Sequence, residues 1–251
     1  MKKGQVTIWI IIAVAIIVAF LILFLVRRSI IIDKTEETNP QLFIQKCIKD
    51  STYEAINIML PQGGFIAPQN YKLYNNTNVA YLCENIGYFY PCINQHPMLL
   101  NEMKKEIKDY ITLKVDNCYL LMESEFEKRQ YEVSLGNKEL TLETELKPGR
   151  IDVHAEKKVT LTKGEETISF DSFDVAVQTH TYELGSLAVE IANQEASYCN
   201  FDSLGYSILY NDFNIRKDTR SDGTDIYILK DKRSNEVMQF AIKGCVNPQG
   251  F

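Results

Sequence analysis

The chain has 251 residues, with 27 lysines and arginines against 33 aspartates and glutamates, so its formal net charge is −6 at pH 7. Residues 1–34 hold five of the bases and one of the acids, which leaves the rest of the chain near −10. A field of that sign repels phosphate backbones, so the composition argues against nucleic-acid binding, and no nucleic-acid partner is expected.

The N-terminal part of the chain contains an uncharged apolar run at residues 4–26, with lysines before it and arginines after it. A helix of about 20 apolar residues crosses the roughly 30 Å core of a bilayer and satisfies its own backbone groups there. The run exceeds the apolar part of a secretory signal and lacks a small-x-small site in a polar region. It therefore predicts a retained transmembrane helix in contact with membrane lipid.

The cysteines indicate the side of the membrane, because basic residues flank both ends of the apolar run and leave its orientation open. All six cysteines follow the run and none forms a CxxC pair, so a zinc site is not expected. An even number of scattered cysteines favours disulfides outside the cytoplasm. We therefore expect a cytoplasmic N-terminus and an extracytoplasmic C-terminal domain in the cell membrane. Asn75, in Asn75-Asn76-Thr77, is a candidate glycosylation site.

The opening stretch KKGQVTIWIII resembles the class III signal of archaeal type IV pilins and related pilin-like proteins. In that family a basic stretch ends in glycine, and a dedicated peptidase cuts before the glutamine that begins the apolar helix. The resemblance implies cleavage between Gly4 and Gln5, and self-association of the helix in a filament. Trp9 stands where many pilins have glutamate, which weakens the case for filament assembly more than the case for membrane insertion.

A second stretch, CIKDSTYEAINIMLPQGGFIAP, resembles a segment of uncharacterised membrane-anchored proteins of small-genome archaea. Those proteins also begin with KGQVT-like anchors. The resemblance implies that lineage and that architecture, and it implies no activity.

A polar linker at residues 33–41 precedes a first helix, which Asn39 and Pro40 begin as cap and first-turn proline. Apolar residues then recur at helical spacing to about Leu60. The adjacent Gly63 and Gly64 end the helix, because glycine adopts positive φ without strain. A ligand loop at this glycine pair is the alternative to a simple helix terminator, which is favoured.

Three disulfides follow from the next predicted elements. Residues 79–92 form a hairpin, which brings Cys83 and Cys92 within reach of each other. A second helix spans Pro97 to about Leu113, and antiparallel packing on the first helix places Cys47 near Cys118. Six cysteines allow fifteen pairings, and the remaining pair would link the end of a third helix to the last strand. These last two cysteines are Cys199 and Cys245.

The β region begins after Phe126, where apolar and polar residues alternate up to Thr179 in a pattern typical of strands with one wet face. Turn residues divide it into four strands, which predicts an antiparallel meander. A change of parity between Phe170 and Phe173 predicts a bulge. A helix at 182–198, apolar on its inner side except for Glu195, lies across the meander. Strands at 206–215, 226–230 and 237–242 end the fold.

The predicted fold class is α+β, with one N-terminal transmembrane helix, a helical segment with a small hairpin, and a meander packed by a helix and C-terminal strands. We assign four regions to this chain. They are residues 1–32 (cytoplasmic tip and transmembrane or pilin-like helix), 33–41 (linker), 42–120 (helical disulfide-bonded subdomain) and 121–251 (antiparallel α+β subdomain).

No motif predicts a catalytic, cofactor or metal site. His180 and Glu183 could share a metal at i and i+3, but they lack a second histidine, so Thr181 as a helix cap and an exposed His180 are expected. His96 and His154 have no partner in the sequence pattern. Residues 218–225 match a calcium loop in part, and a hairpin turn explains them better.

Two functions fit this pattern. The first is a single-pass cell-surface protein, structural or adhesive, which assembles as a filament subunit if it is pilin-like. The second is a membrane-tethered ligand-binding module or an enzyme acting on envelope material, with a pocket between the 182–198 helix and the meander or beside the glycine pair. The missing catalytic motifs favour the first function and predict that the protein is not an enzyme.

Overall fold

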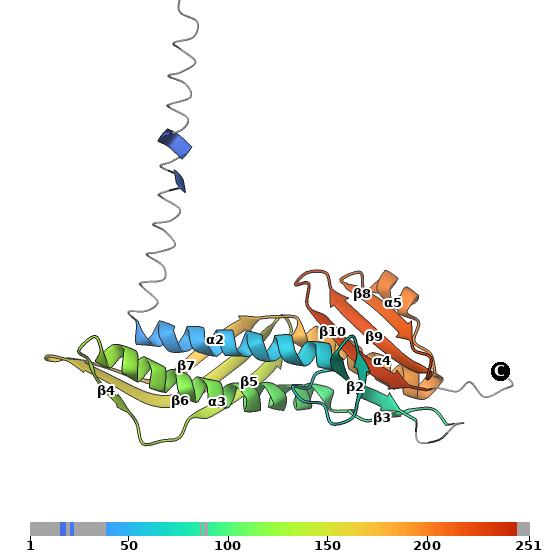
Figure 1. The fold of residues 1–251 in the computed structure, drawn as a ribbon, viewed down its shortest axis with the longest axis horizontal. Coiled ribbons are helices and arrows are strands. Elements are labelled where there is room, and N and C mark those ends of the chain that lie inside the picture. The colour runs from blue at the N-terminus through green and yellow to red at the C-terminus, as the bar shows by residue number, and fades with distance from the viewer. Residues whose placement is uncertain (1–15, 19–20, 23–38, 86, 88–89, 245–251) are drawn as a thin grey trace, which may run out of the picture. The chain divides into compact units, whose positions relative to one another are not determined.

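A computed structural model describes residues 16–18, 21–22, 39–85, 87 and 90–244 (Figure 1). Residues 16–18 and 21–22 are helical, and the rest of the predicted transmembrane segment, with Gly4 and Gln5, lies outside the described residues. Within the described ranges, no helix is both long enough and apolar enough to span a membrane. The chain divides into two compact units, Met1–Ile44 and Gln45–Phe251.

The described elements confirm a mixed α+β fold. The helices are α2 (Pro40–Met59), the short 3-10 helix η1 (Leu60–Gln62), α3 (Leu99–Glu127), α4 (Thr181–Tyr198) and α5 (Ser203–Leu209). The strands are β1 (Tyr71–Tyr74), β2 (Thr77–Glu84), β3 (Ile93–Asn94), β4 (Glu132–Leu135), β5 (Thr141–Lys147), β6 (Arg150–Lys163), β7 (Glu166–Gln178), β8 (Phe213–Thr219), β9 (Thr224–Asp231) and β10 (Val237–Lys243). We call β4–β7 the long sheet, and β1–β3 with β8–β10 the mixed sheet.

Helix α2 begins and ends where the sequence predicts. The Asn39 side chain caps it, because its Oδ1 accepts hydrogen bonds from the amides of Gln41 (2.9 Å) and Leu42 (3.4 Å). Gly63 and Gly64 end it with φ of 81° and 95°. A Cβ on Gly63 would lie 2.8 Å from the Ala80 Cβ, so this position needs glycine for packing as well as for φ.

Helix α3 is longer than predicted, because it continues past Leu113 to Glu127. The added turns bury one side chain every three or four residues, including Cys118, Tyr119 and Phe126. Burial of this face against the long sheet stabilises the helix through the Asp116-Asn117 pair, whose intrinsic helix propensity is low.

The predicted antiparallel packing of α2 and α3 is confirmed (Figure 1). A disulfide joins Cys47 to Cys118, with 6.4 Å between the Cα atoms. Further along the pair, Glu54 on α2 accepts hydrogen bonds from Tyr110 and Lys114 on α3, at 2.7 and 2.9 Å. The two helices are therefore held in a fixed register by one covalent bond and a charged cluster.

The predicted hairpin disulfide is also confirmed. Cys83 and Cys92 are bonded, with 5.4 Å between the Cα atoms, beside the short pairing of β2 with β3. Cys245 lies outside the described residues, so its pairing with Cys199 stays a prediction. Of the described cysteines, none has a free thiol.

The long sheet differs from a simple meander in one connection. β6 pairs with β7 on one edge, and β5 and β4 follow each other along its other edge without pairing with each other. The five residues between them leave the edge after Gly136, whose amide bonds to the Lys158 carbonyl at 2.8 Å. The predicted bulge is confirmed, because the register of β6 and β7 shifts between Glu156 and Val159, opposite Phe170.

The mixed sheet also contains features that the sequence did not predict. β2 pairs in parallel with β10, and β1 forms an additional edge strand. The strand predicted to begin at Tyr206 is wrong in its first half, because Ser203–Leu209 is helix α5. The Asp202 side chain caps α5 by accepting a bond from the Gly205 amide at 2.9 Å, and this local bond favours the helix.

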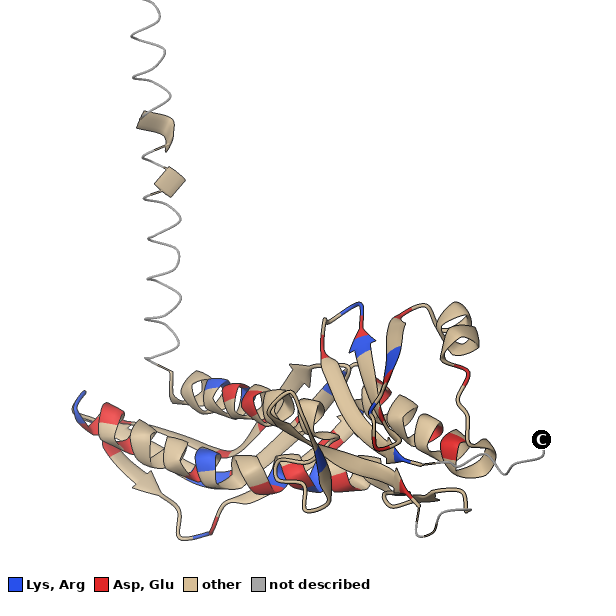
Figure 2. Cartoon of the chain, turned by 45° about the vertical axis from the view of Figure 1, so that its right-hand side comes forward, with Lys and Arg blue, Asp and Glu red and all other residues tan. Residues whose placement is uncertain are grey.

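Helix α4 lies between the two sheets and contacts strands of both. It carries no lysine or arginine, whereas both signs of charge occur along α3 (Figure 2). Its inner side is apolar, as predicted, and buried, but Tyr198 is exposed. The exception, Glu195, is buried and accepts hydrogen bonds from Tyr227 and from Lys217 on the mixed sheet. Among the described residues, the inner side of α4 is thus occupied by buried apolar side chains and by the hydrogen-bonded Glu195.

Candidate functional site

A cavity of about 430 Å³ lies beside the loop that ends α2. This is one of the two places where the sequence allowed a ligand pocket. The loop supplies one wall, and the connection from β3 to α3 and the first turns of α3 supply the other. The side chains that carry its chemistry are Phe65, Gln69, Asn70, Gln95, His96 and Glu106. We call this cavity the QGG groove, after Gln62-Gly63-Gly64, which directly precede the loop.

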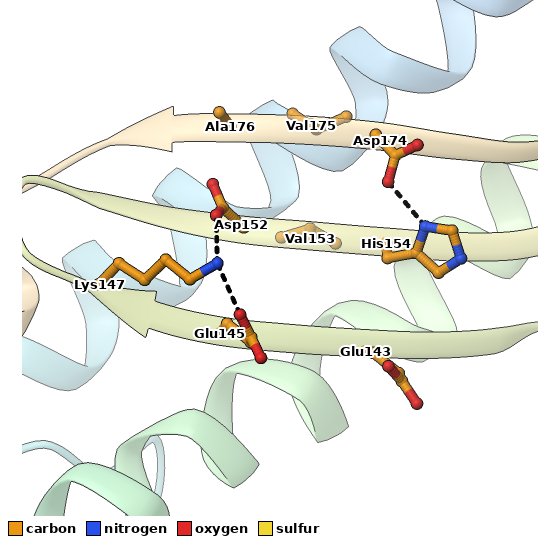
Figure 3. A pocket seen from close by; sticks show the side chains of 9 residues that line it. All are labelled: Glu143, Glu145, Lys147, Asp152, Val153, His154, Asp174, Val175 and Ala176. Carbon is orange, nitrogen blue, oxygen red and sulfur yellow. Dashed lines mark hydrogen bonds and ion pairs between the residues drawn. The ribbon is translucent and has the colours of Figure 1, made fainter.

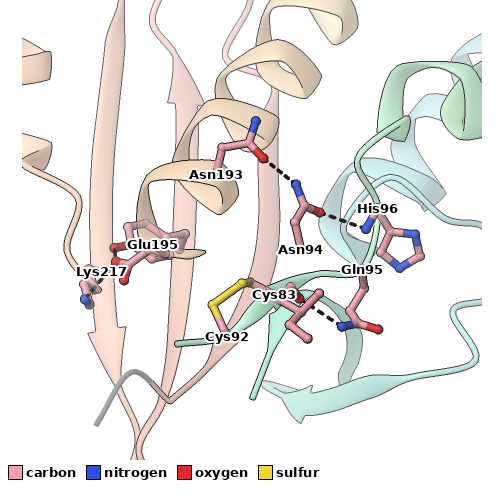
Figure 4. The surroundings of a disulfide bond; sticks show 10 residues. Cys83, Cys92, Asn94, Gln95, His96, Asn193, Glu195 and Lys217 are labelled. Atoms are coloured by element: carbon pink, nitrogen blue, oxygen red, sulfur yellow. Dashed lines mark hydrogen bonds and ion pairs between the residues drawn. A yellow bond between two sulfur atoms is a disulfide. The ribbon is translucent and has the colours of Figure 1, made fainter. Parts of the chain in front are cut away.

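His96 is fixed in the wall of the groove by three contacts. Its Nδ1 lies 2.6 Å from the Glu102 Oε2, and its backbone amide donates to the Asn94 Oδ1 at 2.8 Å (Figure 4). Its ring lies against the Phe65 ring, with 4.6 Å between centroids. The sequence pattern showed no partner for His96, whereas in the structure the first turn of α3 brings Glu102 to it.

The loop wall is held to both neighbouring helices. Glu106 on α3 accepts a bond from the Ile66 amide at 2.8 Å. Gln62, at the end of η1, donates to the carbonyls of Ile58 and Ile66 at 3.1 and 3.0 Å. The groove is therefore formed by a loop whose backbone is bonded at its middle, which favours a preformed site.

The three amide side chains of the groove are also oriented by the protein. Gln69 donates to the Ala67 carbonyl at 3.3 Å, and Gln95 donates to the Ile93 carbonyl at 2.9 Å (Figure 4). Asn70 donates to the Glu84 carboxylate at 2.6 Å. Each amide uses a nitrogen-bound proton for this bond, which leaves its carbonyl oxygen and second proton available to a ligand.

The described lining of the QGG groove defines what it can do chemically. It contains no lysine or arginine to pair with an anion, and no serine, threonine or cysteine to act as a nucleophile. Acyl transfer needs a nucleophile and an oxyanion site as well as side chains such as His96 and Glu106. The arrangement is suited to binding.

A second cavity, of about 510 Å³, lies on the wet face of the long sheet (Figure 3). Its charged side chains bond mainly to one another: Lys147 bridges Glu145 and Asp152 at 2.7 and 2.9 Å, and His154 bonds Asp174 at 2.7 Å. His154, like His96, thus has a partner that the sequence pattern did not reveal. Four carboxylates face one lysine and one histidine here, so an excess of acid remains, but most of these charged groups already bond to one another.

Bonds to carboxylates change the protonation of His154. Hydrogen bonds to Asp174, and then to Glu156, raise its pKa above the ordinary histidine value. The side chain is partly exposed, so solvent screens the effect.

Hydrogen bonds to two carboxylates, Glu236 and Glu183, hold the start of α4. Glu236 accepts bonds from the Thr179 hydroxyl and the His180 amide, both at 2.7 Å, and Glu183 accepts from the Gly149 amide at 2.8 Å. The predicted Thr181 cap is wrong, because Thr181 is already in the first turn of α4 and is buried there. The expected exposure of His180 is also wrong, because its side chain is only 24 % exposed. In the described part of the chain, no three histidine, cysteine, aspartate or glutamate side chains form a metal site.

The segment that matched a calcium loop in part is the turn between β8 and β9, as predicted. The Arg220 amide bonds to the Thr224 carbonyl at 2.7 Å, and Gly223 has a φ of 80°. Asp222 accepts bonds from the Lys72 side chain and the Thr224 amide. The hydrogen bond from Lys72 lowers the pKa of Asp222 to about 2.

Asn75 lies in the turn between β1 and β2 and is exposed. It and Asn76 both have positive φ, 46° and 63°, which is the conformation of a two-residue hairpin turn. The candidate glycosylation site is therefore exposed in a tight hairpin turn. Gly4 and Gln5, the candidate processing site, lie outside the described residues.

No protein-family model matches this chain, and no curated protein or solved structure matches it.

Proposed function

We propose that this protein is a single-pass, membrane-anchored adhesive protein, whose extracytoplasmic domain binds a surface ligand in the QGG groove. The observation that carries the proposal is the groove itself. Its aromatic, amide and carboxylate side chains are held by the protein and open to solvent, and its described lining offers no nucleophile. Such preformed concave sites are typical of binding modules.

The location outside the cytoplasm is supported by the cysteines. Disulfides persist in oxidising compartments, and Cys47–Cys118 and Cys83–Cys92 both join segments that the fold brings together. The uncharged run at residues 4–26 supplies the membrane anchor in this proposal, and Asn75 supplies an exposed glycan acceptor. The binding role requires no cofactor or metal and no catalytic residue.

Assembly as a pilin-like filament subunit is a second candidate, favoured by KKGQVTIWIII. In that case processing between Gly4 and Gln5 would precede self-association of the N-terminal helix. The intact mass of protein from its own cells tests this directly. Loss of residues 1–4 supports the pilin-like route, and an unprocessed terminus makes residues 4–26 a plain anchor.

Accessibility on whole cells tests the proposed location. Protease added outside intact cells should cleave the domain and leave a fragment containing the N-terminus. Maleimide added after reduction of intact cells should label the cysteines, and label added without reductant should not. A domain that is protected until the cells are lysed would contradict the proposal.

A further inference from the structure

The QGG groove carries enough chemistry to identify the class of its ligand, given the proposed binding function. The groove's described ionisable side chains are Glu106 and His96, with no lysine or arginine. Phosphate and carboxylate ligands are recognised by guanidinium or ammonium groups, so this lining does not suit them. Its apolar residues other than Phe65 are alanines and a proline, which bury too little surface to hold an acyl chain.

The amide side chains match a ligand rich in hydroxyl groups. Gln69, Asn70 and Gln95 each present a carbonyl oxygen and a proton, after using one proton within the protein. A hydroxyl group donates and accepts at the same time, so it can bond to both ends of an amide. Glu106 adds an acceptor, because only its Oε2 is bonded, to the Ile66 amide. Bonds to a charged acceptor are about twice as strong as neutral ones.

Phe65 provides an apolar surface next to these polar groups. Its ring is held against the His96 ring, and Glu102 holds His96 in turn. A sugar ring has an apolar face of C–H groups and an edge of hydroxyls, so it can contact the aromatic ring and bond to the amides at once. Among small biological molecules, neutral saccharides combine these two properties.

We infer that the QGG groove binds a neutral saccharide unit, with Phe65 against the apolar face of the sugar ring and Gln69, Gln95 and Glu106 bonded to its hydroxyls. A cavity of about 430 Å³ is at the small end of ligand sites, which suits a terminal or branch-point sugar rather than a long chain segment. Surface glycans present such units in many copies, so a weak single site gives firm attachment when many anchored copies bind together.

Saturation-transfer NMR tests this ligand class on the full-length protein in nanodiscs. The probes are the methyl glycosides of glucose, galactose, mannose and N-acetylglucosamine, with cadaverine as a cationic probe and inorganic phosphate as a competitor. At least one glycoside should receive saturation, strongest at the C–H protons of one ring face. Phosphate should not displace it.

Variants connect the signal to the groove. Gln95→Ala removes an exposed amide and should weaken binding by roughly fivefold, the effect of one lost hydrogen bond, and Glu106→Gln should weaken it by roughly tenfold. Phe65→Ala should abolish the transfer. Glu143→Gln on the wet face of the long sheet and Gln194→Ala on α4 are the matched controls and should not change it.

Each outcome separates the ligand class from the proposed function. Binding of cadaverine, lost in Glu106→Gln, with no glycoside signal would overturn the saccharide assignment and leave a binding groove. A glycoside signal that persists in all three groove variants would overturn the assignment of this site. If no probe binds, the saccharide inference fails, and attachment of cells carrying Phe65→Ala then tests the proposed adhesive function by itself.

Discussion

The long sheet and the mixed sheet are built in different ways from one chain. The long sheet takes its strands from one continuous segment, β4 to β7, and all its pairs are antiparallel. The mixed sheet joins β1–β3 to β8–β10 through the parallel pair of β2 and β10. Parallel pairing requires a long crossover, here most of the fold, so the mixed sheet closes the domain whereas the long sheet can form locally.

Their central tyrosines show a second difference. Tyr119 on α3, packed on the long sheet, and Tyr227 in the mixed sheet are both fully buried. The Tyr227 hydroxyl donates to Glu195, whereas the Tyr119 hydroxyl has no hydrogen-bond partner among the described residues. The buried tyrosine hydroxyl of the mixed sheet is thus hydrogen-bonded. The one between α3 and the long sheet has no partner among the described residues.

Removing the disulfides should give the largest effects. The two losses in the free energy of unfolding show which disulfide stabilises the protein more. The Cys47–Cys118 bond spans 71 residues, so Cys47→Ala with Cys118→Ala should lower the free energy of unfolding by roughly 4 kcal/mol. The Cys83–Cys92 bond spans 9 residues, and its removal should cost roughly 3 kcal/mol. Urea unfolding of the two double variants measures both values. A larger loss from the shorter loop would contradict the chain-entropy explanation.

Replacing Glu195 should be next in size and should affect the mixed sheet alone. Glu195→Leu leaves the Tyr227 hydroxyl without its acceptor and removes one carboxylate from Lys217, which keeps Asp225 at 2.7 Å. Breaking a buried charged pair costs about 3 kcal/mol when part of the network survives. Glu190→Leu, at an exposed position of the same helix, is the control. Equal melting temperatures for the two variants would show that the buried network contributes little.

Removing the two tyrosine hydroxyls should change stability in opposite directions. Tyr227→Phe loses a bond to a carboxylate and should cost about 2 kcal/mol. Tyr119→Phe removes a buried hydroxyl without a partner in the described structure and should stabilise the protein by about 1 kcal/mol. Thermal unfolding of both variants under one condition gives the comparison. A destabilised Tyr119→Phe protein would mean that a buried water bonds this hydroxyl.

The smallest effect is expected on the wet face of the long sheet, where His154 bonds Asp174. The raised pKa of His154 favours the folded state below the unfolded value of about 6.5, and this stability is lost as pH rises through the folded value. The side chain is 38 % exposed, so the contribution is roughly 0.5 kcal/mol. The stability difference between wild type and His154→Gln should therefore shrink from about pH 5.5 to about pH 8. A constant difference would assign the effect to packing.

The comparison of the sheets also explains what the sequence could predict. Alternation and turn residues gave the strands of the long sheet and its bulge, because pairs between neighbours in the chain depend on local pattern. The placement of β4 on the edge of β6 depends on the five-residue connection that begins at Gly136. No strong sequence pattern predicts the path of this connection. The parallel β2–β10 pair and helix α5 were missed, since both are set by contacts or caps that alternation does not encode.

The sequence predicted the position of the candidate site but not the side chains that form it. Gly63 and Gly64 marked a loop where a ligand could bind, but His96 and Glu106 belong to another part of the chain and are brought there by the packing of α3 on α2. Glu102 is six residues from His96, a spacing that becomes a contact only because a turn precedes the helix. Side-chain constellations of this kind follow from tertiary structure.

The Cys47–Cys118 bond has a mechanical consequence for a protein held at one end. A pull entering at Pro40 reaches Cys47 within two turns of α2 and then crosses the disulfide to Cys118. For a load that enters before Cys47 and leaves after Cys118, the loop closed by this bond, with a sequence separation of 71, cannot extend while the bond is intact, which withholds roughly 240 Å of chain at about 3.4 Å per residue. All the residues that line the QGG groove lie within this loop. A load applied between Pro40 and the chain beyond Cys118 would therefore bypass the residues that form the groove.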